Sequence, residues 1–399
     1  MNRHEDISRR EFFQKSVLKA GGVALAGGVV SAAIHSAHAE TTNPATPPQP
    51  PAEMPNIRHR QLGRTKIDVS EICAAGDSIR DPMMFALAVR SGVNYFHKAE
   101  GTFGNPRLRE ELLKNREKFY LDVVIDNLEE DKAYAEFETK RQTIGSEYVD
   151  FFKVHSTWKT VEDFQTKRGV LAAYDRLKKE KKTHWLALSK HGENTPEVLT
   201  AAMETGMFDQ IQPAVPDIRD FQKVLKVAED KNVGVICMKS GKAIKGKGPE
   251  IAKLGDPVQP FQTYLRYLLS LQGVTAVVSS IKNFDQMREN FGASGQPMTK
   301  TEVDAMTLAL QQAPRDYRDC IACGQCHGAC PDSLAVADIM RYRMYAEDYG
   351  DYDAARQQYA ELPASWKAIV ASGNGIRSTA CPYGLALADE LKQAHRWLA

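Results

Sequence analysis

The chain has 399 residues, 43% of them hydrophobic, and a formal net charge of +1 at pH 7. A chain of this length can bury a large core and has room for one large and one small domain. The near-zero net charge excludes bulk electrostatic attraction to nucleic acid or anionic lipid, so we expect no nucleic-acid partner.

The first 39 residues have the features of an export signal. Ser8–Lys15 reads S-R-R-E-F-F-Q-K, and an Ala-, Gly- and Val-rich stretch follows from Ala20 to Ile34. This stretch is shorter than the roughly 20 apolar residues that a spanning helix needs, which disfavours the alternative of a retained anchor. The pattern predicts a twin-arginine signal over residues 1–39, cleaved after Ala39, a periplasmic protein and no stable membrane span.

Residues 40–57 contain six prolines and show no apolar periodicity. This composition predicts a semi-extended linker, and a spacer without a role of its own fits it equally well.

Residues 58–312 alternate short apolar runs with amphipathic stretches. Eight such runs occur, near residues 72, 96, 122, 151, 186, 211, 236 and 278. Their spacing predicts an α/β fold with eight parallel strands closed into a (β/α)8 TIM barrel. An open doubly wound sheet is the competing arrangement, but no G-x-G-x-x-G follows the first run.

Cationic side chains follow several of these runs. Barrel active sites form from the C-terminal ends of the strands and the loops after them. We therefore expect a cationic barrel mouth that could hold a small anionic ligand or a cofactor phosphate. The residues concerned are His97, Lys98, His155, Lys190, His191, Lys239 and Lys282.

Five of the seven cysteines lie in the C-terminal part, residues 313–399. Cys320, Cys323, Cys326 and Cys330 have the spacing C-x2-C-x2-C-x3-C-P that binds iron-sulfur clusters, and Cys381 precedes a second proline. The pattern predicts one 4Fe-4S cluster in a small helical ferredoxin-like domain. A lone run of this kind needs a fourth thiolate, and either Cys381 or Cys330 can supply it.

Zinc, disulfides and c-type haem are less favoured interpretations of these cysteines. Structural zinc usually has ligand pairs separated by a longer finger, and neighbouring C-x2-C thiols are poorly placed to form disulfides. Cys323, Cys326 and His327 also spell C-x-x-C-H, the attachment pattern of c-type haem, but haem would leave the other cysteines without a role. Cys73 and Cys237 stand alone in apolar runs and are predicted core residues.

Several segments together resemble the aldo/keto reductases between residues 58 and 295. They are R-Q-L-G-R-T, G-V-N-Y-F, A-E-G-T-F-G-N, Y-V-D-F-F-K-V-H, A-L-S-K-H-G, G-M-F-D-Q-I-Q, G-V-I-C-M-K and F-D-Q-M-R-E-N. With residues 315–399, the chain is similar to the branch that carries a ferredoxin-like extension. The resemblance implies a (β/α)8 barrel and NAD(P)H-dependent carbonyl reduction by an Asp, Tyr, Lys and His set.

The chain departs from that set at most positions. His97 replaces the acid, Phe103 replaces the tyrosine before Gly-Asn, and Val124-Ile125-Asp126 ends the third run without a lysine. Only His155 remains. A phenyl ring has no proton to donate, and general-acid catalysis contributes about 10²- to 10⁴-fold, so ordinary carbonyl reduction is not expected. His97 or Lys98 as a substitute acid is the alternative.

The family's adenosine-binding stretch is half retained. Glu289 and Asn290 match its Glu-Asn pair, Gln286 replaces its arginine, and Lys239 could contact a cofactor phosphate, so NAD(P) or a flavin is a possible ligand. Three hypotheses follow. The first is an exported iron-sulfur oxidoreductase that exchanges electrons with a redox partner protein. The others are a nicotinamide- or flavin-dependent oxidoreductase with a rewired acid, and a docking subunit with a structural cluster.

Overall fold

The computed structural model describes residues 53–399 with short gaps. These gaps are residues 77, 156, 192–193, 215–217, 239–240, 242–243, 245–246, 248–250, 256–258, 314–319, 321–325, 327, 329, 350, 378–379 and 382–383. The predicted signal and most of the predicted linker therefore lie outside the described residues. Lys239, Cys323 and His327 do so as well.

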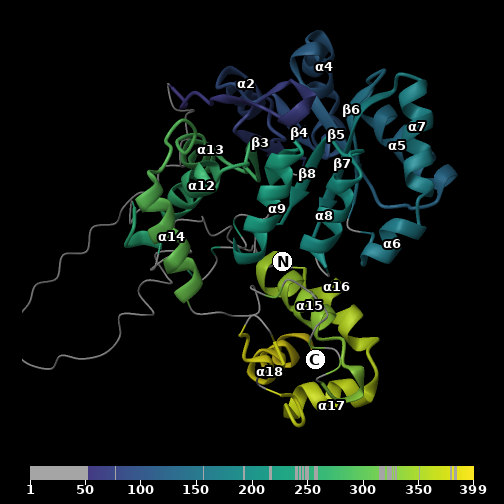
Figure 1. Ribbon diagram of the computed structural model, residues 1–399, viewed down its shortest axis with the longest axis vertical. Coiled ribbons are helices and arrows are strands. Elements are labelled where there is room, and N and C mark those ends of the chain that lie inside the picture. The colour runs from purple at the N-terminus through teal and green to yellow at the C-terminus, as the bar shows by residue number, and fades with distance from the viewer. Residues whose placement is uncertain are drawn as a thin grey trace, which may run out of the picture.

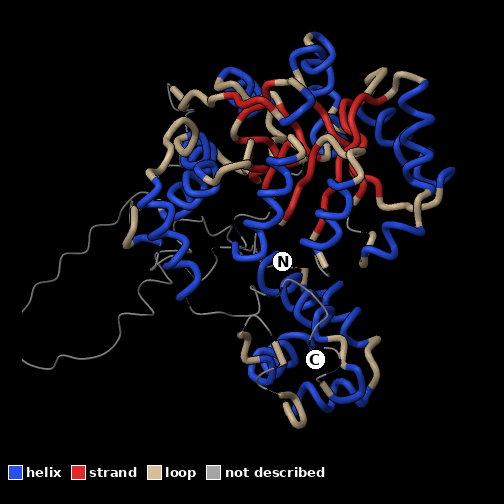
Figure 2. The backbone as a smooth tube through the Cα atoms, viewed as in Figure 1, coloured by secondary structure: helices blue, strands red, loops and turns tan. Residues whose placement is uncertain are grey.

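Eight parallel strands form a closed barrel, as the sequence predicts. Neighbouring strands follow the order β10-β3-β4-β5-β6-β7-β8-β9, and each coincides with one of the eight apolar runs. Figures 1 and 2 show the strands gathered together with helices around them. The strands are β3 (Ile72–Ala75), β4 (Tyr95–His97), β5 (Tyr120–Ile125), β6 (Val149–Val154), β7 (Thr183–Lys190), β8 (Gln210–Pro213), β9 (Gly234–Cys237) and β10 (Ala276–Ser279).

Helices surround the barrel, and several of them start at side chains that satisfy their first amides. Asp81 caps α2 by accepting hydrogen bonds from the amides of Met83 and Met84, and Thr299 forms a capping box with Glu302 in α14. These helices are α2 (Pro82–Arg90), α3 (Ala99–Phe103), α4 (Pro106–Lys114), α5 (Glu130–Ile144), α6 (Val161–Thr166), α7 (Gly169–Lys179), α8 (Thr195–Glu204), α9 (Ile218–Asp230), α12 (Pro260–Ser270), α13 (Phe284–Phe291) and α14 (Lys300–Gln312).

A β-hairpin closes one end of the barrel, a feature that the sequence did not predict. Strands β1 (His59–Gln61) and β2 (Asp68–Ser70) pair antiparallel. Leu62 and Val69 are fully buried and join the hydrophobic cluster that fills the lower barrel interior. The amide of Arg64 donates to the carbonyl of Asn232, just before β9, so the hairpin covers the end at which the strands begin.

The folded body begins slightly before residue 58, inside the segment predicted as linker. Ile57 is buried in the main core, and its amide donates to the carbonyl of Ser91 over 2.7 Å. The apolar side chain of Ile57 therefore belongs to the barrel and not to a solvated tether.

Four helices near the C-terminus share a second hydrophobic core (Figure 1). They are α15 (Val336–Tyr349), α16 (Tyr352–Ala360), α17 (Ala364–Ser372) and α18 (Leu387–Leu398), and we call them the C-terminal lobe. They agree with the small helical domain that the sequence predicts in the C-terminal part. The nearly buried guanidinium of Arg343 ties α15 to α18, with Nη1 2.6 Å from the carboxylate of Glu390.

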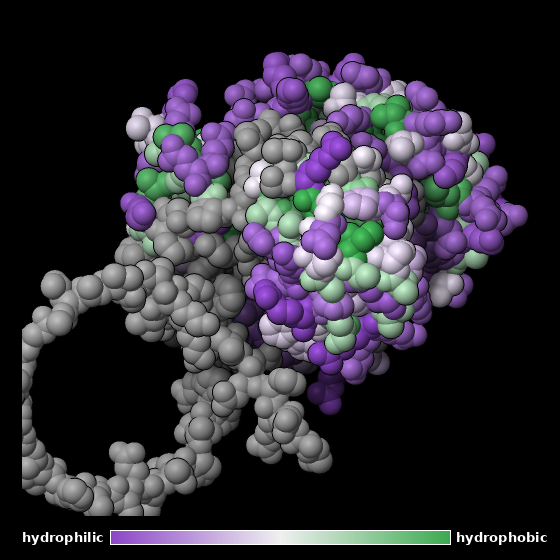
Figure 3. All heavy atoms as spheres, turned by 90° about the horizontal axis from the view of Figure 1, so that it is seen from below, coloured by the Kyte–Doolittle hydropathy of each residue, from purple (hydrophilic) through white to green (hydrophobic). Residues whose placement is uncertain are grey.

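Hydrophilic residues dominate the face seen in Figure 3, where hydrophobic residues form small separate patches. Within the described part of the chain, no helix is long and apolar enough to cross a membrane.

The hairpin contact gives a stability prediction. Leu62→Ala should lower the free energy of unfolding by about 2–5 kcal/mol, because it removes a fully buried side chain from the barrel floor. Leu308→Ala, at a position that is 53% exposed, should change it by less than about 0.5 kcal/mol. Urea unfolding of both variants checks this. Equal effects would show that the hairpin is not part of the cooperative core.

Candidate functional site

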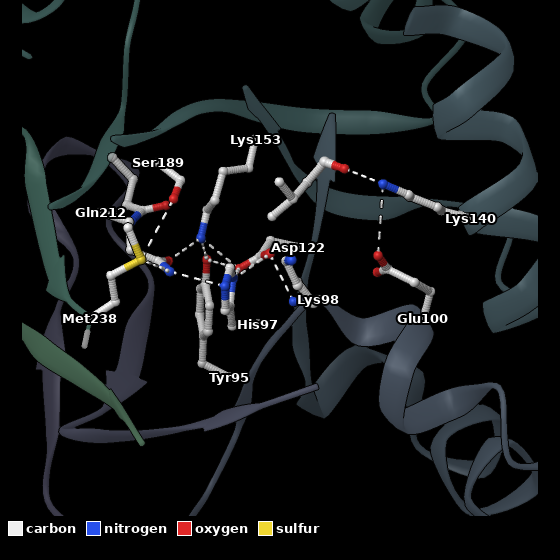
Figure 4. Close-up of polar contacts among 12 residues, drawn as sticks. Tyr95, His97, Lys98, Glu100, Asp122, Lys140, Lys153, Ser189, Gln212 and Met238 are labelled. Carbon is white, nitrogen blue, oxygen red and sulfur yellow. Dashed lines mark hydrogen bonds and ion pairs between the residues drawn. The ribbon is translucent and has the colours of Figure 1, made fainter. Parts of the chain in front are cut away.

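A network of polar side chains crosses the barrel interior above its apolar floor (Figure 4). Its centre is Asp122 on β5. One carboxylate oxygen accepts from Lys153 Nζ at 2.6 Å and from the Tyr95 hydroxyl at 3.0 Å, and the other accepts from His97 Nδ1 at 2.9 Å. Lys153 also donates to the amide oxygen of Gln212 and, over 3.2 Å, to the Tyr95 hydroxyl.

These contacts determine the protonation of His97. Lys153 can only donate, so the Gln212 atom that it contacts is the oxygen, and the amide nitrogen of Gln212 faces His97 Nε2 at 3.1 Å. His97 Nε2 therefore accepts, and its proton sits on Nδ1, which donates to Asp122. Burial lowers the pKa of His97, in agreement with a neutral imidazole.

Asp122 and Lys153 form an ion pair, and both side chains are fully buried. Burial alone would raise the pKa of Asp122, but His97 and Lys153 outweigh it and lower that pKa on balance. Burial lowers the pKa of Lys153, and Asp122 opposes this. Burial and then Asp122 raise the pKa of Tyr95. The Tyr95 hydroxyl is thus a poor proton donor to any ligand.

Sequence reasoning found His97 but missed Tyr95, Asp122, Lys153 and Gln212. Lys153 lies within the Y-V-D-F-F-K-V-H segment, where a charged residue occupies an otherwise apolar strand. Polar residues at alternate positions inside such strands point to one face, and this could have indicated a polar barrel interior. Which of them meet depends on the barrel stagger, which a single sequence does not reveal.

Lys98 lies on a strained turn directly after β4. Its backbone has φ 52° and ψ 55°, a left-handed conformation that is uncommon outside glycine and asparagine. The Lys98 amide donates to Asp122 at 3.0 Å, so the buried carboxylate holds the turn. Gly76 is required beside it, since a Cβ there would lie 2.0 Å from the Lys98 carbonyl oxygen. The lysine side chain itself is exposed.

A second polar group lies where β5, β6 and β7 end. His155 Nδ1 is 2.5 Å from the Asp126 carboxylate, and His155 Nε2 is 3.2 Å from His191 Nε2. The His155 hydrogen bond, with smaller contributions from Lys140 and Lys98, lowers the pKa of Asp126. This group joins the expected His155 and His191 to Asp126, whose role the sequence did not indicate.

The other cationic residues expected at the mouth differ from one another. Lys190 is buried, and its ammonium donates to the backbone carbonyl of His191 at 3.1 Å. Lys282 is exposed and lies just before α13. Lys239 lies outside the described residues.

Phe103 occupies the position of the missing tyrosine and belongs to the core. It is fully buried on α3, with its ring centroid 5.1 Å from that of Phe96 and 5.8 Å from that of Phe85. The ring faces aromatic neighbours that offer no hydrogen-bond partner, so this position is adapted to packing.

Helix α13 carries Glu289 and Asn290, and side chains engage backbone amides near its start. The side chain of Asn283 accepts from the amide of Gln286, and the side chain of Gln286 accepts from the amide of Lys282, which precedes the helix. Gln286, which replaces the motif's arginine, is therefore engaged in a local hydrogen bond. Asn290 is fully buried and donates to Ser279 at 2.8 Å, while Glu289 is partly exposed.

The described cysteines near the C-terminus border the core of the C-terminal lobe. Cys326 and Cys330 are buried members of it, and Cys320 and Cys381 pack against it. Cys73 and Cys237 are fully buried in the barrel, as predicted. Among the described residues, which omit Cys323, no group of three or more His, Cys, Asp or Glu side chains is arranged to hold a metal ion.

Comparison with solved structures identifies the fold. An aldo-keto reductase from Bacillus halodurans matches in its holo and apo forms with TM-scores of 0.53 and 0.51 and 17% and 18% identity. Each match covers 64% of this chain and 96% of that chain. A Pseudomonas aeruginosa protein assigned to the aldo-keto reductases gives 0.50 at 17% identity, covering 61% and 97%.

The barrel has the aldo-keto reductase fold. No protein-family model and no curated protein matches the sequence. The fold, with eight parallel strands, agrees with the fold that the sequence motifs imply.

Placing a tyrosine at residue 103, where the resembled motif has one, should not produce carbonyl reduction. Phe103→Tyr would bury a hydroxyl among aromatic rings without a partner, which costs about 1–3 kcal/mol of unfolding free energy. We expect this loss in urea unfolding and no gain of NADPH-dependent reduction of simple ketones. A stable variant that reduces ketones would show that the side chain at residue 103 reaches the barrel mouth.

The buried His97 predicts acid sensitivity. Below pH 6.5, the ordinary pKa of histidine, the unfolded chain binds a proton that folded His97 does not, so the free energy of unfolding falls as pH drops. One such proton gives a slope of at most about 1.4 kcal/mol per pH unit. Urea unfolding between pH 7.5 and 5.5 should show a shallower slope for His97→Gln. His184→Gln, at an exposed ring, should keep the wild-type slope, and parallel curves for wild type and His97→Gln would contradict the assignment.

Proposed function

We propose that this protein is an exported oxidoreductase in which a C-terminal iron-sulfur module exchanges electrons with a partner protein beside an aldo-keto reductase-type barrel. The observation that carries the proposal is the meeting of four cysteines on one small core. Cys381, far along the chain from the C-x2-C-x2-C-x3-C run, packs against the same core as Cys320, Cys326 and Cys330.

The donor set suits a 4Fe-4S cluster in its chemistry, and four of its cysteines border one core. Thiolates are the usual cluster ligands, and an apolar surrounding limits solvent access. When bound, the cluster would supply one-electron transfer. Burial raises the pKa of the Cys330 thiol, so this thiol is protonated before ligation and must release a proton on binding iron. The same four-cysteine environment disfavours c-type haem, which would use only part of it.

The barrel would contribute ligand binding and proton handling without the family's proton donor. Phe103 has no hydroxyl, and Tyr95 is sealed inside the barrel with a raised pKa. The groups left at the mouth are the exposed Lys98 and the partly exposed His155, next to Asp126. A cation on a strained turn and an imidazole paired with a carboxylate suit a small anionic ligand with an oxygen to protonate.

His97 is better suited to hold this architecture than to act as the acid. Its ring is buried, both partners of its nitrogens, Asp122 and Gln212, lie inside the barrel, and burial lowers its pKa, whereas His155 is partly exposed. A nicotinamide- or flavin-dependent mechanism is also less favoured, since Gln286 stands where the resembled motif has an arginine and its side chain is engaged with the Lys282 amide.

Export by the twin-arginine route completes the proposal. That route carries folded proteins and therefore suits a chain whose cofactor is inserted in the reducing cytoplasm. The signal pattern over residues 1–39 and the cysteine run support each other in this respect. A periplasmic location and a redox partner protein follow from the two together.

Metal analysis of protein purified anaerobically from its native compartment tests the function. We expect about four iron atoms and four labile sulfides per chain and an EPR signal on reduction that is typical of a single cubane cluster. Native protein that contains no iron, with a mature N-terminus that still carries residues 1–39, would end the proposal.

Matched cysteine variants identify the fourth ligand. Cys381→Ala should lower the iron content to less than half of the wild-type value if Cys381 is the ligand, and Cys330→Ala should do so if Cys330 is. Cys237→Ala, in the barrel core, should retain full iron content. Iron and sulfide assays with circular dichroism as a folding check measure this, and full iron content in both lobe variants would contradict thiolate ligation at either position.

A further inference from the structure

A carboxylate and two imidazoles form a chain of contacts at the barrel mouth. Asp126, His155 and His191 follow β5, β6 and β7, three neighbouring strands, so barrel closure itself brings them together. Asp126 lies 2.5 Å from His155 Nδ1, and the two Nε2 atoms lie 3.2 Å apart. The rings are T-shaped to each other, with centroids 5.2 Å apart.

The donor and acceptor capacities of Asp126, His155 and His191 determine which nitrogen atoms carry protons. The Asp126 carboxylate can only accept, so His155 Nδ1 carries a proton and donates it. In neutral His155 the Nε2 atom then holds a lone pair that faces His191 Nε2. The 3.2 Å separation is satisfied when His191 carries its proton on Nε2 and donates it to His155.

We infer that Asp126 and His191 are positioning residues that hold His155 as the proton-handling group of the mouth. The role rests on the oxidoreductase function proposed above, whereas the proton arrangement does not. His155 would take one additional proton from solvent at Nε2, which ends the donation from His191, hold it as an imidazolium against Asp126, and pass that proton to an oxygen atom of the bound ligand. Each cycle consumes one solvent proton and returns neutral His155, whose Nε2 accepts from His191 again.

The exposure of Asp126 and His155 suits proton transfer from solvent to a ligand. The Asp126 side chain is 58% exposed and that of His155 is 27% exposed, so the pair can exchange protons with water and still face a ligand in the mouth. Asp126 is held in place through its own backbone amide, which donates to the carboxylate of Glu136 on α5.

Charged side chains from the neighbouring elements surround Asp126 and His155. Lys98 follows β4, Lys140 and Glu136 lie on α5, Glu100 lies on α3, and Lys190 ends β7. Lys140 contacts Glu136 at 2.7 Å, and Lys190 donates to the His191 carbonyl. Lys140 and Lys190 are thus engaged within the protein, and the exposed Lys98 is the lysine of this set that favours an anionic ligand over a bare metal cation at the mouth.

Nitrogen NMR of the full-length protein with ¹⁵N-labelled histidine tests the arrangement directly. Long-range ¹H–¹⁵N correlation near pH 7.5 distinguishes the two tautomers, and His155→Gln assigns the resonance. We expect His155 to be mainly the Nδ1–H tautomer with an unprotonated Nε2. Asp126→Ala should switch the major tautomer, and His191→Leu should reduce the Nδ1–H population because Nε2 loses its donor.

Two further variants separate this role from a merely structural one. His191→Gln keeps an N–H donor and should restore most of the wild-type tautomer. His184→Ala, at the opposite end of β7, should leave the His155 signals unchanged, as should removal of iron. A wild-type His155 that is mainly Nε2–H, or one that ignores Asp126→Ala, overturns the inference. Stoichiometric Zn²⁺ binding that is lost in His155→Gln would also overturn it.

Discussion

The buried ion pair between Asp122 and Lys153 organises the barrel above its floor. Removing either partner would leave a charge inside the barrel, at a cost of about 3–5 kcal/mol. The pair sets the orientation of the Gln212 amide, which in turn makes His97 an acceptor at Nε2. Asp122 also receives the Lys98 amide and so fixes the left-handed turn at the mouth. Buried electrostatics thus determine both the protonation of the interior and the presentation of an exposed lysine.

The sequence was sufficient to predict the strands but not the side-chain contacts inside the barrel. Eight apolar runs with helical stretches between them determine a closed parallel barrel, since each strand buries both faces. Asp122 and Lys153 are 31 residues apart and meet only because their strands are adjacent at one stagger of the barrel. The hairpin that holds Leu62 was missed because its strands are only three residues long and have no strong apolar alternation.

The same contrast separates the two sets of candidate residues. His155 was found because it ends a strand, and strand ends converge on the mouth by topology alone. For its partner Asp126, the sequence indicated only that the motif's lysine is missing, because the proposed role of Asp126 depends on a contact with His155 after the next strand. In the C-terminal lobe the cysteine spacing is local information, and the approach of Cys381 to the same core is tertiary information that spacing cannot supply.

The barrel contains an Asp, a Tyr, a Lys and a His in one network, yet their surroundings argue against the chemistry of the aldo-keto reductase set. A proton-donating tyrosine needs a lowered pKa and contact with the ligand. Tyr95 has the opposite, because burial and Asp122 raise its pKa and its ring is fully enclosed. The polar interior therefore supports the fold. Under the proposed function, proton handling is left to the partly exposed His155, and electrons would come from the thiolate-rich lobe to a barrel that has no tyrosine donor.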